Sequence, residues 1–291
     1  MSQHRKEEPR FSILMPCLDK AGYIDAALDS ALSQMADGDE LLVQDAHSTD
    51  GTSETVARRA ANDPRIRHYI ERDSGQTDAL NRALKKATNE WIVWLNADDM
   101  LLPGALDAVR AALRGEDDGA DIGLVIGDHL IVDDAGATID DFPADPLDKR
   151  TLLRVGTAMF SGSTVIRKDI LEEIGAFDER YYCAMDLDLQ FRLAERNPGR
   201  IYIDKPLGAL RMNDTTKLSN AAHIFVRECW ELRRRYSHGA DYLWAIYGEA
   251  IQLAAWATLR IRLTKRYRRI RRLVVRRPAP SLAVADNSTA A

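Results

Sequence analysis

Two adjacent acids follow an apolar stretch and are the first residues that suggest chemistry. The segment WIVWLNADD, residues 91–99, has the character of a buried strand that ends at Asp98 and Asp99. Crowded carboxylates repel each other unless a cation or hydrogen-bond donors share their site. Because Mg²⁺ is often held by one or two carboxylates together with phosphate oxygens, the pair suits a diphosphate ligand. The alternative is that both acids only cap a helix beginning near Pro103.

Acids also end two other predicted strands. Asp45 ends ELLVQD, and Asp128 ends DIGLVIGD. Because parallel strands present their carboxyl ends at one edge of a sheet, we expect Asp45, Asp98 and Asp128 on the same rim. Each acid alone would also suit a turn, where Asp is common. Three acids on one rim favour a cleft for a metal–phosphate group or another polar ligand.

Two predicted helix starts carry further polar groups. Asp73-Ser74-Gly75-Gln76 ends a loop and starts a helix with Asp78 and Asn81 on its first turns, where free backbone amides suit an anion. Asp186 and Asp188, in YCAMDLDLQFR, lie near another helix start. A carboxylate there could accept the proton of an attacking hydroxyl. The alternative for this second pair is plain helix capping.

Strand-like and helix-like segments alternate in the first half of the chain and would position these groups. The predicted buried strands are FSILMP, ELLVQD, RIRHYI, EWIVWLN and DIGLVIGD, and the predicted helices cover residues 23–34, 52–61, 77–87 and 103–113. This alternation predicts an α/β fold, with a mostly parallel sheet and helices on both faces. Ligands of such sheets bind beyond the carboxyl ends of the strands.

The second half is less regular. HLIVDDAGATI predicts a hairpin, SGSTVI a further strand, and residues from Ala221 onward a helical extension that includes a helix over 242–272. We therefore expect an N-terminal tail over residues 1–10, one α/β domain over 11–220, a helical, basic extension over 221–277, and a tail over 278–291 with the composition of disorder.

The net charge of −5 conceals an asymmetry. Residues 258–277 contain ten Arg or Lys residues and no acid, which leaves 30 basic and 45 acidic residues elsewhere. An acidic body argues against binding to nucleic acid, whereas the basic segment suits an anionic membrane surface. The alternative is a solvated helix that packs on the acidic body or on a partner.

The cysteines and the apolar segments bear on localisation. Cys17, Cys183 and Cys229 are too few and too scattered for a disulfide framework or a zinc site, which predicts reduced thiols. The polar start MSQHRKEEPR does not resemble a secretory signal, and no segment has the apolar length that spans a bilayer. We expect a cytoplasmic protein, peripheral on the inner face of the membrane.

Taken in order, the motifs resemble glycosyltransferase family 2, an inverting family with the GT-A fold. The resemblance covers roughly residues 11–217 and includes ILMPCLDKAGYIDAALDSALSQ, VQDAHSTDGT, DSGQTDALNRAL, WLNADD, GDHLIVDDAGA, FSGSTVIRKDILEEIGAFDE and AMDLDLQFRLA. It implies transfer of a sugar from a nucleotide-diphosphate sugar, UDP-linked by expectation, to a hydroxyl acceptor. The acceptor would be a glycan or a lipid-linked glycan of the cell surface, and the cofactor Mg²⁺ or Mn²⁺.

The resemblance also implies residue roles. The residues assigned to the nucleotide-sugar are Pro16, Leu18, Asp45, Gly75, Asp78, Asn81, Asn96 and Asp98. Those assigned to the metal are Asp98, Asp99 and Asn213. Asp186 matches the general base, and Asp188 matches the supporting acid after it.

The sequence departs from the family pattern at four places. Ala46-His47 replaces the usual two glycines, and Asn96 replaces the first acid of the Asp-x-Asp motif. Met185 stands where Glu often precedes the base, and Arg211-Met212-Asn213 replaces a frequent Arg-x-His. Asn213 would still offer a carbonyl oxygen to a hard cation.

Two other classes of protein remain open. A sugar nucleotidyltransferase would share the alternating sheet, but it needs a phosphate loop rich in glycine and lysine after the first strand, where CLDKAGY has one glycine. A non-catalytic nucleotide-sugar-binding or scaffold protein would keep Asp45 and lose the base, which Asp186 argues against.

Overall fold

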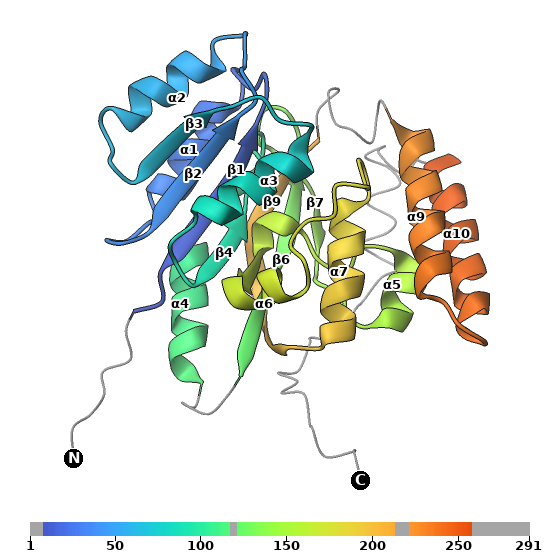
Figure 1. Cartoon of the computed structure of the whole chain (residues 1–291). Coiled ribbons are helices and arrows are strands. Elements are labelled where there is room, and N and C mark those ends of the chain that lie inside the picture. Colours follow the sequence, from blue (N-terminus) through green and yellow to red (C-terminus); the bar gives the residue numbers. More distant parts are fainter. Residues whose placement is uncertain (1–7, 117–120, 213–220, 258–291) are drawn as a thin grey trace, which may run out of the picture.

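The computed structural model describes residues 8–116, 121–212 and 221–257, which form a nine-stranded sheet with helices on both faces (Figure 1). The strands are β1 (Phe11–Cys17), β2 (Glu40–Asp45), β3 (Ile66–Ile70), β4 (Trp91–Trp94), β5 (Met100–Leu101), β6 (Ile122–Val132), β7 (Thr138–Phe142), β8 (Thr164–Arg167) and β9 (Gly199–Arg211). The helices are α1 (Ile24–Leu32), α2 (Thr52–Ala60), α3 (Gln76–Lys86), α4 (Ala105–Gly115), α5 (Lys149–Val155), the 3₁₀ turn η1 (Ser161–Ser163), α6 (Lys168–Glu173), α7 (Met185–Arg196), α9 (Ala222–Tyr236) and α10 (Asp241–Ala257).

The strand order is β3-β2-β1-β4-β8-β6-β9-β5, with β7 beside β6. β1 is parallel to both β2 and β4, and β2 is parallel to β3, whereas β8 is antiparallel to β4 and β6. The chain moves outward from β1 to β3 and then returns to the other side of β1. In α/β sheets ligands bind at the carboxyl ends of strands beside such a reversal, here β1 and β4. The predicted α/β fold is confirmed.

Both faces of the sheet are buried because strand side chains alternate between two apolar layers. Ile13 and Val43 pack in the layer that contains α1, α2 and α4. Leu14 and Leu42 pack in the other layer, with α3, α7 and the C-terminal helices. The period-two pattern of the apolar strands thus fixes which helices cover each face.

The C-terminal helices α9 and α10 lie together at one side of the molecule (Figure 1) and contact α7 and α5. The fully buried Arg233 donates to Glu249 at 2.7 Å and to the carbonyl of Leu153 at 3.2 Å, which links α9, α10 and α5. A methyl group at Gly248 would overlap the carbonyl oxygen of Leu153, so α10 needs glycine at this contact. The extension is therefore packed firmly on the α/β body.

Two expectations about strand and helix ends are wrong. β6 continues to Val132 because it pairs with β9 across register shifts around Asp128, so this acid lies inside a strand rather than at its end. The Asp128 carboxylate accepts a hydrogen bond from the Ala144 amide at 2.8 Å. The helix after Pro103 is α4, whose N-cap is Gly104 and has no side-chain cap, so Asp98 and Asp99 do not cap it.

Other expectations are confirmed or fall outside the described residues. HLIVDDAGATI forms the β6–β7 hairpin, and all three cysteines are free thiols. Among the described helices, none combines the length and apolarity needed to cross a bilayer. The tail over 278–291, the basic segment 258–277, most of residues 1–10 and the boundary near residue 220 lie outside the described ranges.

Candidate active site

A cavity of about 410 Å³ lies beside the carboxyl ends of β1 and β4. This volume is in the range of small-ligand sites. The predicted site residues that line it are Pro16, Leu18, Gly75, Asn96, Asp98 and Asp99. Further polar side chains that were not predicted as site residues also line it, among them Lys20, Asp73, Gln76, Tyr182 and Arg211.

The two acids after β4 differ in their surroundings. Asp98 accepts a charged hydrogen bond from Lys20 at 2.8 Å, and its side chain keeps 16% of its surface exposed. Asp99 is buried and accepts hydrogen bonds from the Arg211 amide at 2.9 Å and from the Asn96 side chain at 2.8 Å. Burial and the neighbouring Asp98 raise the pKa of Asp99 to about 7. A cation near both acids would relieve this repulsion.

Asn96 stands where the family motif has an acid, and hydrogen bonds hold its side-chain amide in one orientation. Its Oδ1 accepts hydrogen bonds from Trp94 at 2.8 Å and Gln76 at 2.6 Å, while its Nδ2 donates to Asp99. An acid here could not donate to Asp99 and would add a third negative charge. Asn96 therefore supports the ionised form of Asp99.

The acids suit a cation that is shared with a ligand. No group of three or more His, Cys, Asp or Glu residues able to hold a metal is found in residues 8–116, 121–212 and 221–257. Asp98 and Asp99 supply two carboxylates at the cavity, and Mg²⁺ sites of this kind are completed by phosphate oxygens and water. The donor set fits a cation bound together with a diphosphate. Asn213, the third predicted ligand, lies outside the described residues.

A second cavity, of about 280 Å³, adjoins the first and contains Asp186 in its wall. The two cavities share Gln76, Asn96 and Leu210. Asp186 lies in the first turn of α7, where the helix dipole favours a negative charge. Asp98 and Asp186, which are 88 positions apart in the sequence, thus line adjoining cavities.

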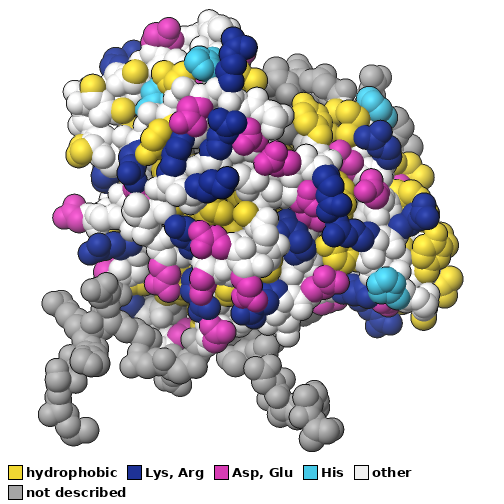
Figure 2. Space-filling view, viewed as in Figure 1, with side chains coloured by type: hydrophobic (Ala, Val, Ile, Leu, Met, Phe, Trp, Pro, Cys, Tyr) yellow, Lys and Arg dark blue, Asp and Glu magenta, His cyan; other side chains and the backbone are white. Residues whose placement is uncertain are grey.

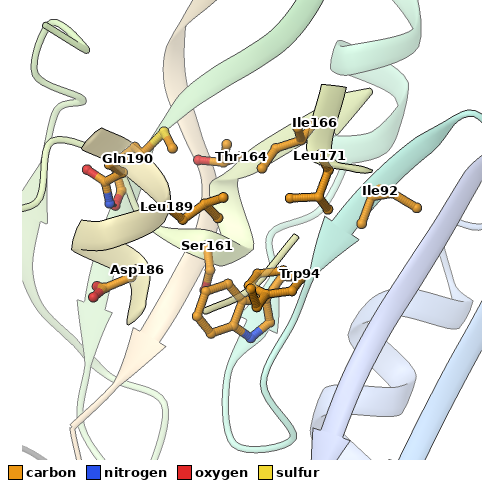
Figure 3. Close-up of a pocket in the computed structure, with 11 residues that line it drawn as sticks. Ile92, Trp94, Ser161, Thr164, Ile166, Leu171, Asp186, Leu189 and Gln190 are labelled. Carbon is orange, nitrogen blue, oxygen red and sulfur yellow. The ribbon is translucent and has the colours of Figure 1, made fainter. Parts of the chain in front are cut away.

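Asp186 also borders a third, much smaller cavity of about 20 Å³ (Figure 3). In this view Asp186 and Leu189 come from α7, Trp94 and Ile92 come from β4, and the Asp186 carboxylate points away from the apolar side chains. A space of this size holds about one water molecule and no sugar. The 280 Å³ cavity is therefore the one that offers room for a reacting group beside Asp186.

Asp45 is not among the described residues that line the two larger cavities, and it stabilises a neighbouring loop instead. It is fully buried and accepts hydrogen bonds from the amide and hydroxyl of Ser48, at 2.8 and 2.7 Å, and from Ser53. Burial raises its pKa, but the His68 imidazole at 3.5 Å and the hydrogen bonds from Ser53 and Ser48 outweigh this and hold the pKa below its ordinary value. Asp45 thus fixes the loop after β2, whose Ala46 lines the larger cavity.

Three other predicted site residues are engaged in packing contacts and are not among the described residues that line the two larger cavities. Asp78 pairs with an arginine one turn later on α3 at 2.8 Å. Asn81 hydrogen-bonds both backbone groups of Phe177, at 2.9 and 3.0 Å. Asp188 is buried and pairs with Arg192 at 2.7 Å, although burial raises its pKa. These residues hold α3, α7 and the loop between α6 and α7 in place.

Two basic residues were missed as site residues by sequence reasoning. Lys20 lies three residues after β1, in the CLDKAGY segment, and its place after a first strand was an available signal. Arg211 ends β9, 112 positions from Asp99, and no local pattern links the two. Both carry positive charge at the larger cavity, where a diphosphate would need it.

Comparisons with known proteins show the family of the chain. The family model "Glycosyl transferase family 2" matches residues 12–175, more than half of the chain. A "PGL/p-HBAD biosynthesis glycosyltransferase" of Mycobacterium tuberculosis is 33% identical over 186 residues, which cover 63% of this chain and 69% of that protein. An "Uncharacterized glycosyltransferase" of Rickettsia felis is 28% identical over 206 residues, which cover 68% of this chain and 33% of that protein.

Two solved structures have similar folds. TarS of S. aureus, residues 1–349 with UDP-GlcNAc, superposes with a TM-score of 0.60 at 19% identity, covering 78% of this chain and 65% of that one. The mannosyltransferase PcManGT of Pyrobaculum calidifontis, with GDP-Man and Mn²⁺, gives a TM-score of 0.60 at 22% identity, covering 91% and 84%. The chain belongs to glycosyltransferase family 2 and has the GT-A fold of a sugar transferase.

Proposed function

We propose that the chain transfers a sugar, with inversion, from a nucleotide-diphosphate sugar in the 410 Å³ cavity to a hydroxyl in the 280 Å³ cavity. The observation that carries the proposal is that the two adjoining cavities have different charged side chains in their walls. The larger has Lys20, Arg211 and the Asp98–Asp99 pair in its wall, and the smaller has Asp186. Phosphate binding and hydroxyl activation need these two different sets of groups.

The donor would lie with its diphosphate near Lys20 and Arg211. The ammonium of Lys20 is held by Asp98 at 2.8 Å and would exchange this partner for phosphate oxygens. The free backbone amides at the start of α3, after Gly75, offer further donors to an anion. TarS binds UDP-GlcNAc and PcManGT binds GDP-Man, and both support a nucleotide sugar as donor. We take a UDP-linked sugar as the first candidate.

Asp98 and Asp99 would hold Mg²⁺ or Mn²⁺, as the presence of Mn²⁺ in the PcManGT complex supports. The chemistry that such a cation supplies is Lewis-acid neutralisation of the departing diphosphate. The protein's own part is to present Asp98 at the cavity and to hold Asp99 through the Arg211 amide and Asn96. The cation site would thus already be in place beside the diphosphate, on which negative charge develops during the reaction.

Asp186 would act as the general base. Its carboxylate accepts the proton of the acceptor hydroxyl while the oxygen attacks the anomeric carbon from the side opposite the diphosphate. The bond from this carbon to the new oxygen forms as the bond to the diphosphate oxygen breaks, which inverts the centre. Asp186 gains support as the base because it lies in the adjoining cavity rather than beside the phosphate-binding groups.

The acceptor would be a glycan or a lipid-linked glycan at an anionic membrane surface. Six large apolar side chains of α10 are exposed, namely Tyr242, Leu243, Ile246, Tyr247, Ile251 and Leu253. Hydrophobic side chains gather at the edge of the molecule over α10 (Figure 2). Residues 258–277, with ten basic residues and no acid, follow directly in the sequence. An apolar face beside a basic segment is typical of helices that lie on anionic membranes.

A donor screen tests the proposed function. The full chain is mixed with UDP-, GDP- and dTDP-linked sugars, each with Mg²⁺, Mn²⁺ or EDTA, and its melting temperature is measured. We expect one nucleotide to raise the melting temperature with a divalent cation and much less with EDTA. Slow release of the nucleotide by donor hydrolysis would then separate a catalyst from a non-catalytic binding protein. Failure of every nucleotide sugar to bind would contradict the proposal.

A further inference from the structure

A buried acid of the C-terminal extension binds the backbone that precedes α7. Glu228 of α9 is only 4% exposed, and its two carboxylate oxygens accept hydrogen bonds from three consecutive amides. These amides belong to Tyr182, Cys183 and Ala184, at 3.0, 2.8 and 2.9 Å. Hydrogen bonds to a carboxylate are stronger than those between neutral groups. Glu228 therefore fixes a backbone segment that lies 44 to 46 positions earlier in the chain.

This backbone segment belongs to the walls of both larger cavities. Tyr182 lines the 410 Å³ cavity, and Cys183 lines the 280 Å³ cavity. Met185 and Asp186, the first two residues of α7, follow in the wall of the smaller cavity. Ala184, the N-cap residue of α7, has no side-chain group that could cap the helix. The place at which α7 starts therefore depends on the contact with α9.

The Asp186 carboxylate follows the backbone of α7. Its Oδ1 accepts a hydrogen bond from the amide of the next residue, Leu187, at 2.8 Å. Asp186 is two residues after Ala184, whose amide Glu228 binds. A shift of the start of α7 would therefore move the carboxylate with it. A displacement of about 1 Å at a reacting group can lower a rate by about 100-fold.

The helix that carries Glu228 is itself packed firmly. α9 lies beside α7 (Figure 1), and the rings of Phe191 and Tyr236 from the two helices stack at 4.5 Å between centroids. The fully buried Arg233 ties α9 to Glu249 of α10 at 2.7 Å. α9 starts well after residue 175, where the family match ends. The support of α7 thus comes from the extension of this chain.

Building on Asp186 as the proposed base, we propose that Glu228 is a positioning residue for transfer, which sets the start of α7 from α9 and so places the Asp186 carboxylate. Glu228 is not among the described residues that line the two larger cavities, so it acts through Asp186 rather than on the substrates. The C-terminal extension is then part of the catalytic unit as well as the proposed membrane contact.

Glu228→Gln tests this role. The side chain keeps its size, but one acceptor oxygen becomes an amide group whose N–H bonds point at the backbone N–H groups. Turnover is measured as nucleoside diphosphate released from the nucleotide sugar that the donor screen identifies, with water as the acceptor of the sugar. We expect kcat to fall about 10-fold or more. Nucleotide affinity should stay within about 3-fold, because Lys20 and Arg211 lie on other elements.

Two further variants separate positioning from stability. Glu228→Asp keeps a carboxylate and should recover part of the lost rate. Glu249→Gln weakens the ion pair with the buried Arg233 and leaves the loop before α7 unchanged. It should lower the melting temperature and keep kcat within about 2-fold of wild type. All rates are measured below the melting transition of each variant.

A double-variant cycle tests whether Glu228 acts through Asp186. If it does, adding Glu228→Gln to Asp186→Asn should change the remaining rate by no more than about 2-fold, because the base is already lost. Two independent losses would multiply instead, and a multiplied loss overturns the positioning role. A merely structural contribution of Glu228 would give this multiplied result.

The reactivity of Cys183 reports on the loop without any donor. Its thiol is partly buried, whereas Cys17 and Cys229 are 4% and 1% exposed and serve as internal references. We expect iodoacetamide to alkylate Cys183 about 3-fold or more faster in Glu228→Gln than in wild type or in Glu249→Gln, as measured by mass spectrometry.

The outcomes separate this proposal from the proposed function. Unchanged Cys183 alkylation or near-normal kcat in Glu228→Gln overturns the positioning role, even if the wild-type chain turns over its donor. An equal loss of kcat in Glu249→Gln also overturns it. Failure of the wild-type chain to bind any nucleotide sugar contradicts the proposed function instead.

Discussion

At the scale of residues, the site depends on how neighbouring charges are held apart and paired. Asp98 meets Lys20, whereas Asp99 is buried and receives hydrogen bonds from Asn96 and the Arg211 amide. Similar side chains therefore have different roles because their surroundings differ. Asp98 is the group that can exchange its partner for a cation, and Asp99 is the group whose ionisation depends on that exchange.

The proposed role of Asp186 as general base is tested by Asp186→Asn. An amide cannot accept the hydroxyl proton, so we expect the transfer rate to fall about 100-fold or more. Donor affinity should stay within about 2-fold, because Asp186 is not among the described residues that line the larger cavity. Asp204→Asn, at an exposed position of β9, is the matched control. Near-normal turnover by Asp186→Asn would reject the assignment.

The pH dependence of cation binding follows from Asp99. Its pKa is raised to about 7, so it is mostly protonated at about pH 6 and mostly ionised at about pH 8. Cations bind the ionised form, and Mn²⁺ affinity in the presence of a nucleotide sugar should therefore increase about 10-fold over this interval. A nucleotide sugar is used because its diphosphate does not titrate there. Asp99→Asn should remove the increase, and a pH-independent wild-type affinity would contradict the prediction.

The side-chain contacts within the candidate site could be predicted from the sequence only in part. Asp98 and Asp99 were found because they follow an apolar strand closely, and such strands can be recognised from the local pattern. The pairing of Asp98 with Lys20 and of Asp99 with the Arg211 amide joins residues 78 and 112 positions apart, and such pairs depend on the folded sheet. The contacts of Asn81 with Phe177 depend on which side of α3 faces the loop, which the residue types alone did not determine.

At the scale of elements, two loops after parallel strands are tied together beside the larger cavity. The Asp19 amide donates to the Ser48 hydroxyl at 2.9 Å, and the Asp19 carboxylate accepts from the Thr49 amide at 2.8 Å. Asp45 holds Ser48 in turn. His47, which replaces a family glycine, has a φ of 62°, in the region that glycine adopts most easily. The loop thus keeps a glycine-like turn without glycine.

The packing of α10 is tested by Gly248→Ala. The added methyl group would overlap the Leu153 carbonyl oxygen, so α10 must shift away from α5. We expect the free energy of unfolding to fall by about 1–3 kcal/mol, measured by urea denaturation. Gly22→Ala is the control, because no atom lies within 4 Å of its added methyl group. Equal stability of the two variants would show that α10 does not depend on this contact.

The elements themselves were largely predictable. The strands β1 and β4 are apolar at almost every position, and β2 has an apolar centre, Leu41–Val43; this pattern predicts buried parallel strands correctly. β6 was predicted too short because its last residues are held by pairing with β9, a strand that begins 67 positions after Val132. Local pattern does not contain that pairing. The predicted helix over 242–272 agrees with α10 as far as Ala257, where the described residues end.

At the scale of the whole molecule, the two larger cavities adjoin each other, and α9 and α10 lie together at one side of the molecule (Figure 1). The exposed face of α10 carries Leu243 with 71% of its surface accessible. Together with the basic residues 258–277, this face would hold the enzyme on an anionic membrane surface, as proposed above. A lipid-linked acceptor would then reach the enzyme from the surface on which the protein lies.

Membrane association is tested by sedimentation with vesicles. The full chain should sediment with vesicles of phosphatidylglycerol and phosphatidylcholine, and much less with phosphatidylcholine alone. Because each basic residue near an anionic surface contributes about 1 kcal/mol, a chain that ends at Ala257 should lose most of the binding. Leu243→Ser combined with Ile246→Ser should weaken it in the full chain. Equal sedimentation of the full and shortened chains would favour packing on the body or on a partner.

The proposed function depends most directly on Asp98 holding a cation that is shared with the donor diphosphate. Calorimetric titration of the nucleotide, with Mn²⁺ and with EDTA, measures this directly in wild type, Asp98→Asn and the exposed control Asp107→Asn. We predict that Mn²⁺ tightens nucleotide binding about 10-fold or more in wild type and in Asp107→Asn, and has little effect in Asp98→Asn. An unchanged Mn²⁺ effect in Asp98→Asn would contradict the claim.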